Sequence, residues 1–322
     1  MTSTSSNSKT LEQSVRAMYS EHPFPNYISI PPSQSDERFR YIYEEFLQIP
    51  LDQLVNNTFL DAGCGTGENT WSWTRILDPS THVVAVDQSW ASVTIAQRHG
   101  SDRPRSPSFA VGSLLNLTLA DNSVDVVFCS GVLVAVTDPD RAFRELVRVL
   151  RPGGYMILVL YHRYGRALHG FRRAIIDLIE REDIDRRAQL GGKLFGQSMR
   201  KLAAETHAPL EGVLYDQFGL PCESRYSVGQ VLAWYRQANI RYLGTWPPIE
   251  WKQFGKALRF TSVFRRRRPW LHRFLLRLFR DTDCSPDRPP RFVTRATMQV
   301  LWALDQLQLF AISGRKEAHS GD

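Results

Sequence analysis

Three glycines and an acid lie close together near the start of the chain. Gly63, Gly65 and Gly67 alternate with single residues, and Asp61 precedes them after a short apolar run. This order predicts a strand, a tight turn and a helix start, which is where a nucleotide-like ligand lies in an open α/β sheet. Glycine suits such a turn because a Cβ would block close approach of the ligand, and because the turn must visit positive φ.

The spacing and the charge of this stretch indicate the kind of ligand. A dinucleotide-binding turn has the pattern G-x-G-x-x-G, which clears a pyrophosphate, whereas the third glycine here comes one residue early. The carboxylate of Asp61 inside the motif suits a ligand that has a positive end and no phosphate. S-adenosylmethionine, with its ammonium and sulfonium groups, fits that description.

A second acid ends the next predicted strand. Asp87 follows a buried apolar run and lies twenty residues after Gly67. A carboxylate at this place can accept hydrogen bonds from both ribose hydroxyls of a nucleoside. Taken alone it could be a helix N-cap, but its distance from the glycine turn favours the ligand.

A third motif completes a family resemblance. Residues 150–154 read Leu-Arg-Pro-Gly-Gly before an apolar strand. With the glycine turn and the strand ending in Asp87, this resembles class I S-adenosylmethionine-dependent methyltransferases, nearest to the small-molecule, ubiquinone-biosynthesis-like branch. The resemblance is strong over 58–161 and faint elsewhere. It implies an α/β fold with a doubly wound, Rossmann-like, mostly parallel sheet of seven strands and helical insertions after strands five and six.

The resemblance also implies where the parts of the cofactor lie. The glycine turn frames the amino-acid end, the acid after strand two holds the ribose, the end of strand three borders the adenine, and the end of strand four lines the floor near the methyl. The residues expected to contact S-adenosylmethionine are Asp61, Gly63, Cys64, Gly65, Gly67, Asp87, Gln88, Ser113, Leu114, Cys129 and Ser130.

The chain departs from the family pattern at two places. Related enzymes often carry an acid for the adenine amino group where this chain has Ser113, which has no charge. They also often carry histidines near Val134 and Ala135, which are apolar here.

No motif fixes a catalytic base. Methyl transfer from a sulfonium needs mainly alignment of the nucleophile, and a base is needed only for a protonated alcohol or an acidic carbon. His162, after strand five, is the best placed candidate, although it can equally be a hydrogen-bonded loop histidine. Asp216 can instead begin a turn or pair with Arg225. The candidates are His162, Tyr19, His22 and Asp216, and no metal is expected.

The hydrophobic patterns predict the elements that carry these residues. Residues 1–9 are expected to be disordered, and the Pro-Phe-Pro stretch at 19–27 to fold over the cofactor pocket, with a surface linker as the alternative. Strands are predicted at 58–62, 82–87, 107–111, 124–129, 155–161, 240–246 and 309–313. Helices are predicted at 10–19, 36–48, 68–77, 89–99, 139–150, 166–182, 193–206 and 228–238.

These elements suggest a division of the chain. The predicted parts are an N-terminal tail with capping helices (1–57), the cofactor-binding core (58–161), a helical lid (162–225), a core helix and strand six (226–246), a basic helical insertion (247–306) and strand seven with the C-terminal tail (307–322).

Composition limits the function classes. The 322 residues are 43% hydrophobic and 23% charged, and the four cysteines form no close pairs, which predicts a reduced, cytoplasmic globular protein. Ten Lys or Arg and no acid lie in 251–280, so without them the overall charge of +7 becomes about −3. Within this segment, 265–280 predicts a basic amphipathic helix that either packs on the domain or makes peripheral contact with a membrane.

We therefore predict a cytoplasmic S-adenosylmethionine-dependent methyltransferase that acts on an O, N or C atom of a small organic metabolite, lipophilic or aromatic ones included. Nucleic acid is not favoured as a partner, and the oligomeric state stays open. The alternatives are a protein or RNA methyltransferase that uses 251–280, a non-catalytic S-adenosylmethionine-binding relative, and a dinucleotide-dependent redox enzyme, which the glycine spacing disfavours.

Overall fold

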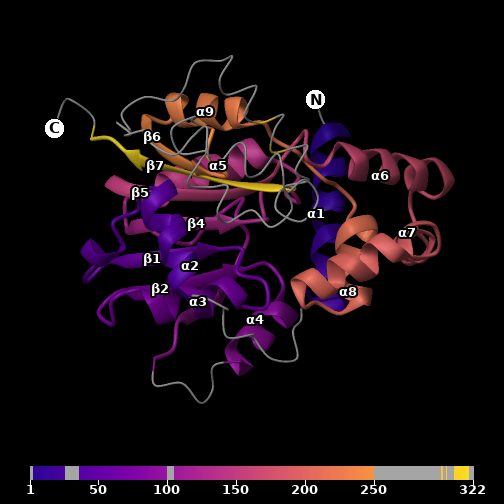
Figure 1. Ribbon diagram of the computed structural model, residues 1–322, viewed down its shortest axis with the longest axis horizontal. Coiled ribbons are helices and arrows are strands. Elements are labelled where there is room, and N and C mark those ends of the chain that lie inside the picture. The colour runs from indigo at the N-terminus through magenta and orange to yellow at the C-terminus, as the bar shows by residue number, and fades with distance from the viewer. Residues whose placement is uncertain are drawn as a thin grey trace, which may run out of the picture.

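A seven-stranded sheet forms the centre of the computed structural model (Figure 1). The described residues are 3–25, 36–99, 105–249, Gln299, Trp302 and 308–318. The basic segment 251–280, with its predicted helix at 265–280, lies outside them, as does nearly all of the predicted insertion 247–306. None of the described helices is long and apolar enough to cross a bilayer.

The strand order confirms the predicted fold class. It is β3-β2-β1-β4-β5-β7-β6, and only the pairings of β7 with β5 and β6 are antiparallel. The strands are β1 (Thr58–Ala62), β2 (His82–Asp87), β3 (Ser108–Val111), β4 (Val124–Ser130), β5 (Leu150–Tyr161), β6 (Ile240–Trp246) and β7 (Leu309–Lys316). Since β1 pairs with β2 on one side and β4 on the other, the topological switch point of the sheet lies at the carboxyl end of β1.

Both faces of the sheet are covered by helices, and β1 is therefore apolar on both sides. Phe59 and Leu60 are fully buried in different core clusters, because successive side chains point to opposite faces. The helices that follow the parallel strands are α3 (Glu68–Ile76), α4 (Trp90–Arg98) and α5 (Pro139–Val149), and α9 (Val228–Gln237) precedes β6. Phe143 of α5 stacks on Trp234 of α9 at 5.1 Å, which closes one of the two layers.

Several boundaries differ from the predictions. Helix α1 (Ser3–Glu21) begins inside the segment that was expected to be disordered. The predicted helix at 36–48 divides into α2 (Asp36–Tyr41) and a π-helix, η1 (Ile42–Phe46), before a 3-10 turn, η2 (Leu51–Gln53). Strand β5 starts five residues early, because Leu150 already pairs with Val124 of β4. The Pro-Gly-Gly motif, with Gly153 at φ +79°, forms an irregularity within the strand.

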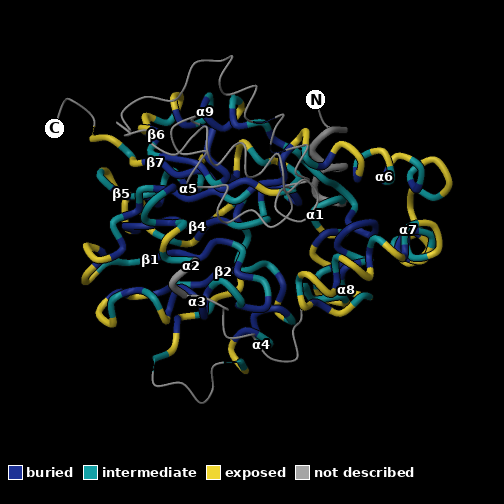
Figure 2. Tube along the Cα trace, in the orientation of Figure 1, coloured by how far each residue is buried: buried dark blue, intermediate teal, exposed yellow. Residues whose placement is uncertain are grey.

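The helices after β5 form a smaller body beside the sheet. They are α6 (Ala167–Ile179), α7 (Ile184–Thr206), α8 (Leu210–Leu214) and a π-helix, η3 (Tyr215–Gly219). Helix α7 begins nine residues before the prediction because Asp183 caps it, accepting a hydrogen bond from the backbone N–H of Arg186 at 2.9 Å. Figure 1 shows α1 between this body and the sheet, and Figure 2 shows the outer sides of α6 and α7 exposed.

Two glycines of α7 provide a test of how η3 is packed. A Cβ added at Gly191 would lie 2.2 Å from the Cδ2 atom of the buried Phe218, whereas one at Gly196 would meet only a guanidinium nitrogen of Arg200 at 3.4 Å. Gly191→Ala should therefore lower the free energy of unfolding by about 1–3 kcal/mol. Gly196→Ala should leave it unchanged or raise it by up to about 1 kcal/mol, because alanine favours the helix. Equal urea midpoints for the two variants would contradict this packing.

Candidate functional site

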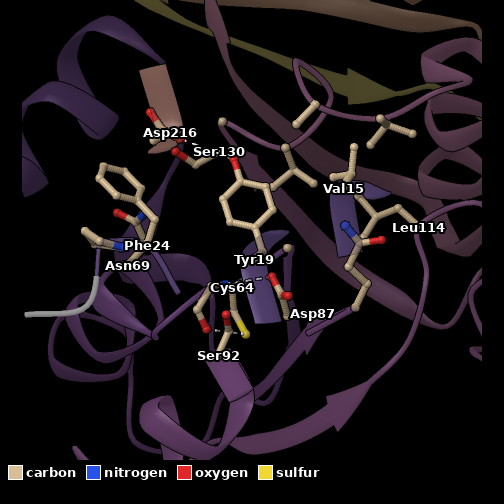
Figure 3. Close-up of a pocket in the computed structure, with 18 of the residues that line it drawn as sticks. Val15, Tyr19, Phe24, Cys64, Asn69, Asp87, Ser92, Leu114, Ser130 and Asp216 are labelled. Carbon is tan, nitrogen blue, oxygen red and sulfur yellow. Dashed lines mark hydrogen bonds between the residues drawn. The ribbon is translucent and has the colours of Figure 1, made fainter. Parts of the chain in front are cut away.

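A cavity of about 320 Å³ lies at the carboxyl ends of β1, β2 and β4. The glycine turn and the ends of these strands line one side, and α1 and η3 line the other (Figure 3). Of the residues that the sequence assigns to the cofactor, this cavity is lined by Gly63, Cys64, Gly65, Asp87, Gln88, Ser113, Leu114 and Ser130.

The glycine turn has the conformation that its sequence predicts. Gly63, Gly65 and Gly67 have φ values of +84°, +51° and +87°, which L side chains rarely adopt. A Cβ at Gly63 would also lie 2.1 Å from Cγ2 of Val132. The turn therefore needs glycine both for its backbone and for its contact with the loop after β4.

Asp87 joins the turn to the end of β2. Its Oδ2 accepts a hydrogen bond from the backbone N–H of Gly65 at 2.9 Å, and its Oδ1 accepts one from the backbone N–H of Ser89 at 2.8 Å. Burial raises the pKa of the Asp87 carboxyl, while these backbone donors oppose the rise. The backbone N–H of Gln88 is a further donor to this carboxyl, and since a carboxylate has about four lone-pair sites, it can still accept from a ligand. The cap of α4 is Ser89 and not Asp87, since the Ser89 hydroxyl accepts the hydrogen bond from Ser92 N–H.

Three of the expected cofactor residues do not line the cavity. Asp61 is 1% exposed and accepts a hydrogen bond from the Thr70 hydroxyl at 2.6 Å, beneath the turn. Cys129 is fully buried in the core, and Gly67 caps the start of α3. Burial raises the pKa of the Asp61 carboxyl to about 7. Asp61 thus lies beneath the turn that lines the cavity, and its direct contact with the cofactor stays a prediction.

Helix α1 and the Pro-Phe-Pro stretch after it form a wall of the cavity that the sequence predicted only in part. Phe24 and Pro25, from the Pro-Phe-Pro stretch, line the cavity, and so do Val15 and Glu12. The carboxylate Oε1 of Glu12 accepts a hydrogen bond from the Ser113 hydroxyl at 3.0 Å. An acid thus lies beside Ser113 after all, but it comes from an element 101 residues away, and no spacing rule in the sequence connects the two.

The four candidate bases separate into two pairs. Tyr19 and Asp216 line the cavity, whereas His22 and His162 do not. His22 stacks on Tyr215 with ring centroids 3.4 Å apart.

His162 lies outside the site that its topology predicted. It is buried beside a smaller second cavity, and its Nδ1 accepts a hydrogen bond from the backbone N–H of Gly165 at 3.1 Å. Burial lowers the pKa of His162 to about 4, so the ring is neutral at physiological pH. The loop-histidine interpretation describes this arrangement.

The far wall of the cavity is formed by the half-buried Tyr19 with the buried Tyr161 and Asp216, here called the tyrosine–aspartate cluster. The Tyr19 hydroxyl donates to Oδ1 of Asp216 at 3.2 Å, and the Tyr161 hydroxyl donates to Oδ2 at 3.4 Å. The side-chain amide of Gln217 donates to the same Oδ2 at 2.7 Å. Burial is the main cause of the raised pKa of the Asp216 carboxyl, and the charge of Arg166 opposes it.

Arg166 supports this wall from behind. Its guanidinium lies 3.7 Å from the centroid of the Tyr161 ring and forms a buried ion pair with Glu223 at 2.8 Å. The alternative partner for Asp216 that the sequence suggested, Arg225, instead lies 3.6 Å from Glu223.

The cavity suits a cationic nucleoside. Within the described ranges its charged lining residues are four acids, Glu12, Glu68, Asp87 and Asp216, with no Lys, Arg or His. At Gly131 an added Cβ would meet no atom within 4 Å, so the backbone there borders open space in the cavity. Carboxylates attract an ammonium and a sulfonium and repel a pyrophosphate. The charge of the cavity therefore disfavours a dinucleotide, as the glycine spacing does.

Comparison with known proteins identifies the kind of domain that this core forms. Residues 60–158 match the family described as a methyltransferase domain. Residues 60–158 are thus a methyltransferase domain, which resembles those of class I S-adenosylmethionine-dependent methyltransferases. The ubiquinone/menaquinone biosynthesis C-methyltransferase of Hahella chejuensis is 33% identical over 32% of this chain and 43% of its own length. The human thiol S-methyltransferase TMT1A is 33% identical over 36% of this chain and 52% of its own length.

Two further proteins are similar to this chain over most of its length, beyond the methyltransferase domain. An uncharacterized protein of Synechococcus is 28% identical over 84% of this chain and 69% of its own length. A geranyl diphosphate C-methyltransferase structure from Streptomyces coelicolor covers 95% of this chain and 98% of its own, at 13% identity and a TM-score of 0.47, which is too remote to bear on function. The chain spans about half or less of the length of the two named methyltransferase relatives above.

The buried acid beneath the glycine turn of this methyltransferase domain should make stability depend on pH. The unfolded chain releases the Asp61 proton near pH 4, whereas the folded protein holds it up to about pH 7. The contribution of this group to the free energy of unfolding is thus present below pH 4 and is lost as the pH rises through 7. Asp61→Asn keeps an acceptor for Thr70 and removes the titration.

The measurement is urea unfolding of the wild type and of Asp61→Asn between pH 5 and pH 8. The free energy of unfolding of the variant, relative to the wild type, should rise by roughly 2–3 kcal/mol over this range. Asp121→Asn, at an exposed acid paired with Arg148, serves as the control. Parallel curves for the wild type and Asp61→Asn would show that Asp61 is ionised in the folded state.

Proposed function

We propose that this protein transfers the methyl group of S-adenosylmethionine to a small organic molecule bound between the glycine turn and the tyrosine–aspartate cluster. The observation that carries the proposal is the position of Asp87. Its carboxylate is held by two backbone N–H groups at the switch point of the sheet and faces a cavity whose described charged residues are all acids. S-adenosylmethionine supplies the reactive methyl carbon and the leaving group when bound.

The lining residues suggest how the cofactor is held. The free acceptor sites of Asp87 suit the ribose hydroxyls. The turn at Gly63–Gly65, with Glu68 at the start of α3, suits the amino-acid end because its ammonium group pairs with a carboxylate. At the other end of the cavity, the Glu12 carboxylate held by Ser113 is placed to accept a hydrogen bond from an adenine amino group.

The protein itself would contribute alignment and exclusion of water. Phe24 and Pro25 cover the glycine turn, where a Cβ at Gly65 would lie 3.1 Å from the carbonyl oxygen of Phe24. Tyr19 lies across the centre of the cavity (Figure 3). Closure of this kind orders an acceptor beside the methyl group, and such alignment lowers a barrier by roughly 7–11 kcal/mol in favourable cases.

No observation on the described residues favours the alternative of a protein or RNA substrate. That alternative depends on the basic segment 251–280, which lies outside them.

Calorimetric titration with S-adenosylhomocysteine tests the cofactor assignment. Asp87→Ala removes the acceptor for both ribose hydroxyls and frees the glycine turn, so affinity should fall by about 1–3 kcal/mol, or roughly 5- to 150-fold. Asp121→Ala, at an exposed acid away from the cavity, is the control and should bind as the wild type does. Unchanged affinity in Asp87→Ala would overturn the assignment.

A further inference from the structure

The tyrosine–aspartate cluster presents acceptors to the cavity. Both phenol protons are directed to the Asp216 carboxylate, at 3.2 Å from Tyr19 and 3.4 Å from Tyr161. The phenol oxygens therefore have only lone pairs left for a ligand, and the carboxylate is an acceptor by nature. A group bound against this wall must donate hydrogen bonds, because an acceptor would leave these buried groups unsatisfied.

The charges around the wall exclude an anionic ligand. The cavity has no cationic side chain in the described part of the chain. The guanidinium of Arg166 lies behind the Tyr161 ring and pairs with Glu223 at 2.8 Å. Its other hydrogen bonds go to the side-chain oxygens of Gln217 and Gln308. A phosphate or carboxylate group on the molecule that accepts the methyl group would find no counter-charge at this wall, whereas a cationic group would.

Aromatic rings complete the same part of the cavity. Tyr19, Phe24 and Tyr161 all line it, and Figure 3 shows the Tyr19 hydroxyl directed toward Asp216. A carboxylate among aromatic rings is an arrangement that binds ammonium groups, through the ion pair and through cation–π attraction to the ring faces.

We infer that the acceptor of this methyltransferase is an amine, whose nitrogen is held by Asp216 and the two tyrosines. This inference rests on the proposed function and names the substrate class of the same cavity. Asp216 is then a catalytic residue, because it contacts the reacting nitrogen, while Gln217 keeps its carboxylate in position with a hydrogen bond of 2.7 Å.

The proposed methyl transfer is balanced in protons and electron pairs by the groups present. An amine that arrives as ammonium gives one N–H proton to the Asp216 carboxylate, which leaves a lone pair on nitrogen. That lone pair forms the new N–C bond as the methyl C–S bond breaks, with its electron pair going to sulfur. The product is a methylated ammonium and a neutral thioether, and the Asp216 proton returns to solvent when the product leaves.

The experiment compares three probes of one size on the full chain. Binding of S-adenosylhomocysteine is measured first. The saturated protein is then titrated calorimetrically with benzylamine, benzyl alcohol and benzoate. Benzylamine should bind about tenfold or more tighter than benzyl alcohol, and benzoate should not bind. With S-adenosylmethionine in place of S-adenosylhomocysteine, mass spectrometry should show N-methylated benzylamine.

Two variants test whether Asp216 and Tyr161 cause the preference for the amine, and a variant at an exposed acid is the control. Asp216→Asn should lose about tenfold or more in benzylamine affinity and keep benzyl alcohol within about threefold. Tyr161→Phe, which keeps the ring and removes one hydroxyl, should lose benzylamine affinity by a few fold. Asp121→Asn should change neither probe.

The outcomes separate this inference from the function on which it rests. A chain that does not bind S-adenosylhomocysteine would overturn the proposed function, and the amine inference with it. A chain that binds it, yet binds benzyl alcohol or benzoate as tightly as benzylamine, would overturn the amine inference alone. Equal benzylamine affinity in the wild type and in folded Asp216→Asn would do the same.

Discussion

The hydrogen bond from the Gly65 backbone N–H to the Asp87 carboxylate is the constraint on which the site depends. It joins the loops that leave β1 and β2, and the second oxygen of Asp87 fixes Ser89, which in turn caps α4. Parallel strands bring these loops to one edge of the sheet. One half-buried carboxylate therefore sets the shape of the turn and also faces the cavity, so a mutation at Asp87 would change both.

The opposite wall depends on a contact between segments that are distant in the chain. Tyr19 of α1 and Asp216 of η3 are 197 residues apart, and their hydrogen bond closes the cavity over the sheet edge. Val15 and Met18 of α1 are 2% exposed, so apolar burial holds the helix in place while its polar side chains reach the cavity. The wall proposed to hold the cofactor is thus built from the ends of sheet strands. The opposite wall is built mainly from α1 and η3, with Tyr161 from the end of β5.

The sequence predicted the parts of the site whose signals are local. The glycine turn and the strand ending in Asp87 were found because three glycines and a buried strand ending in an acid mark a parallel βα unit. Glu12 and the pairing of Tyr19 with Asp216 were not predicted, because contacts across more than a hundred residues leave no spacing signal. His162 was misplaced because a strand end marks the right edge of the sheet without fixing the direction of a side chain.

The most direct test is a crystal structure of the protein with S-adenosylhomocysteine. The account predicts both ribose hydroxyls within hydrogen-bond distance of the Asp87 carboxylate, the adenine between Leu114 and Glu12, and the sulfur on the side that faces Asp216. Density for the nucleoside elsewhere, or a ribose that leaves Asp87 bonded only to Gly65 and Ser89, would contradict it.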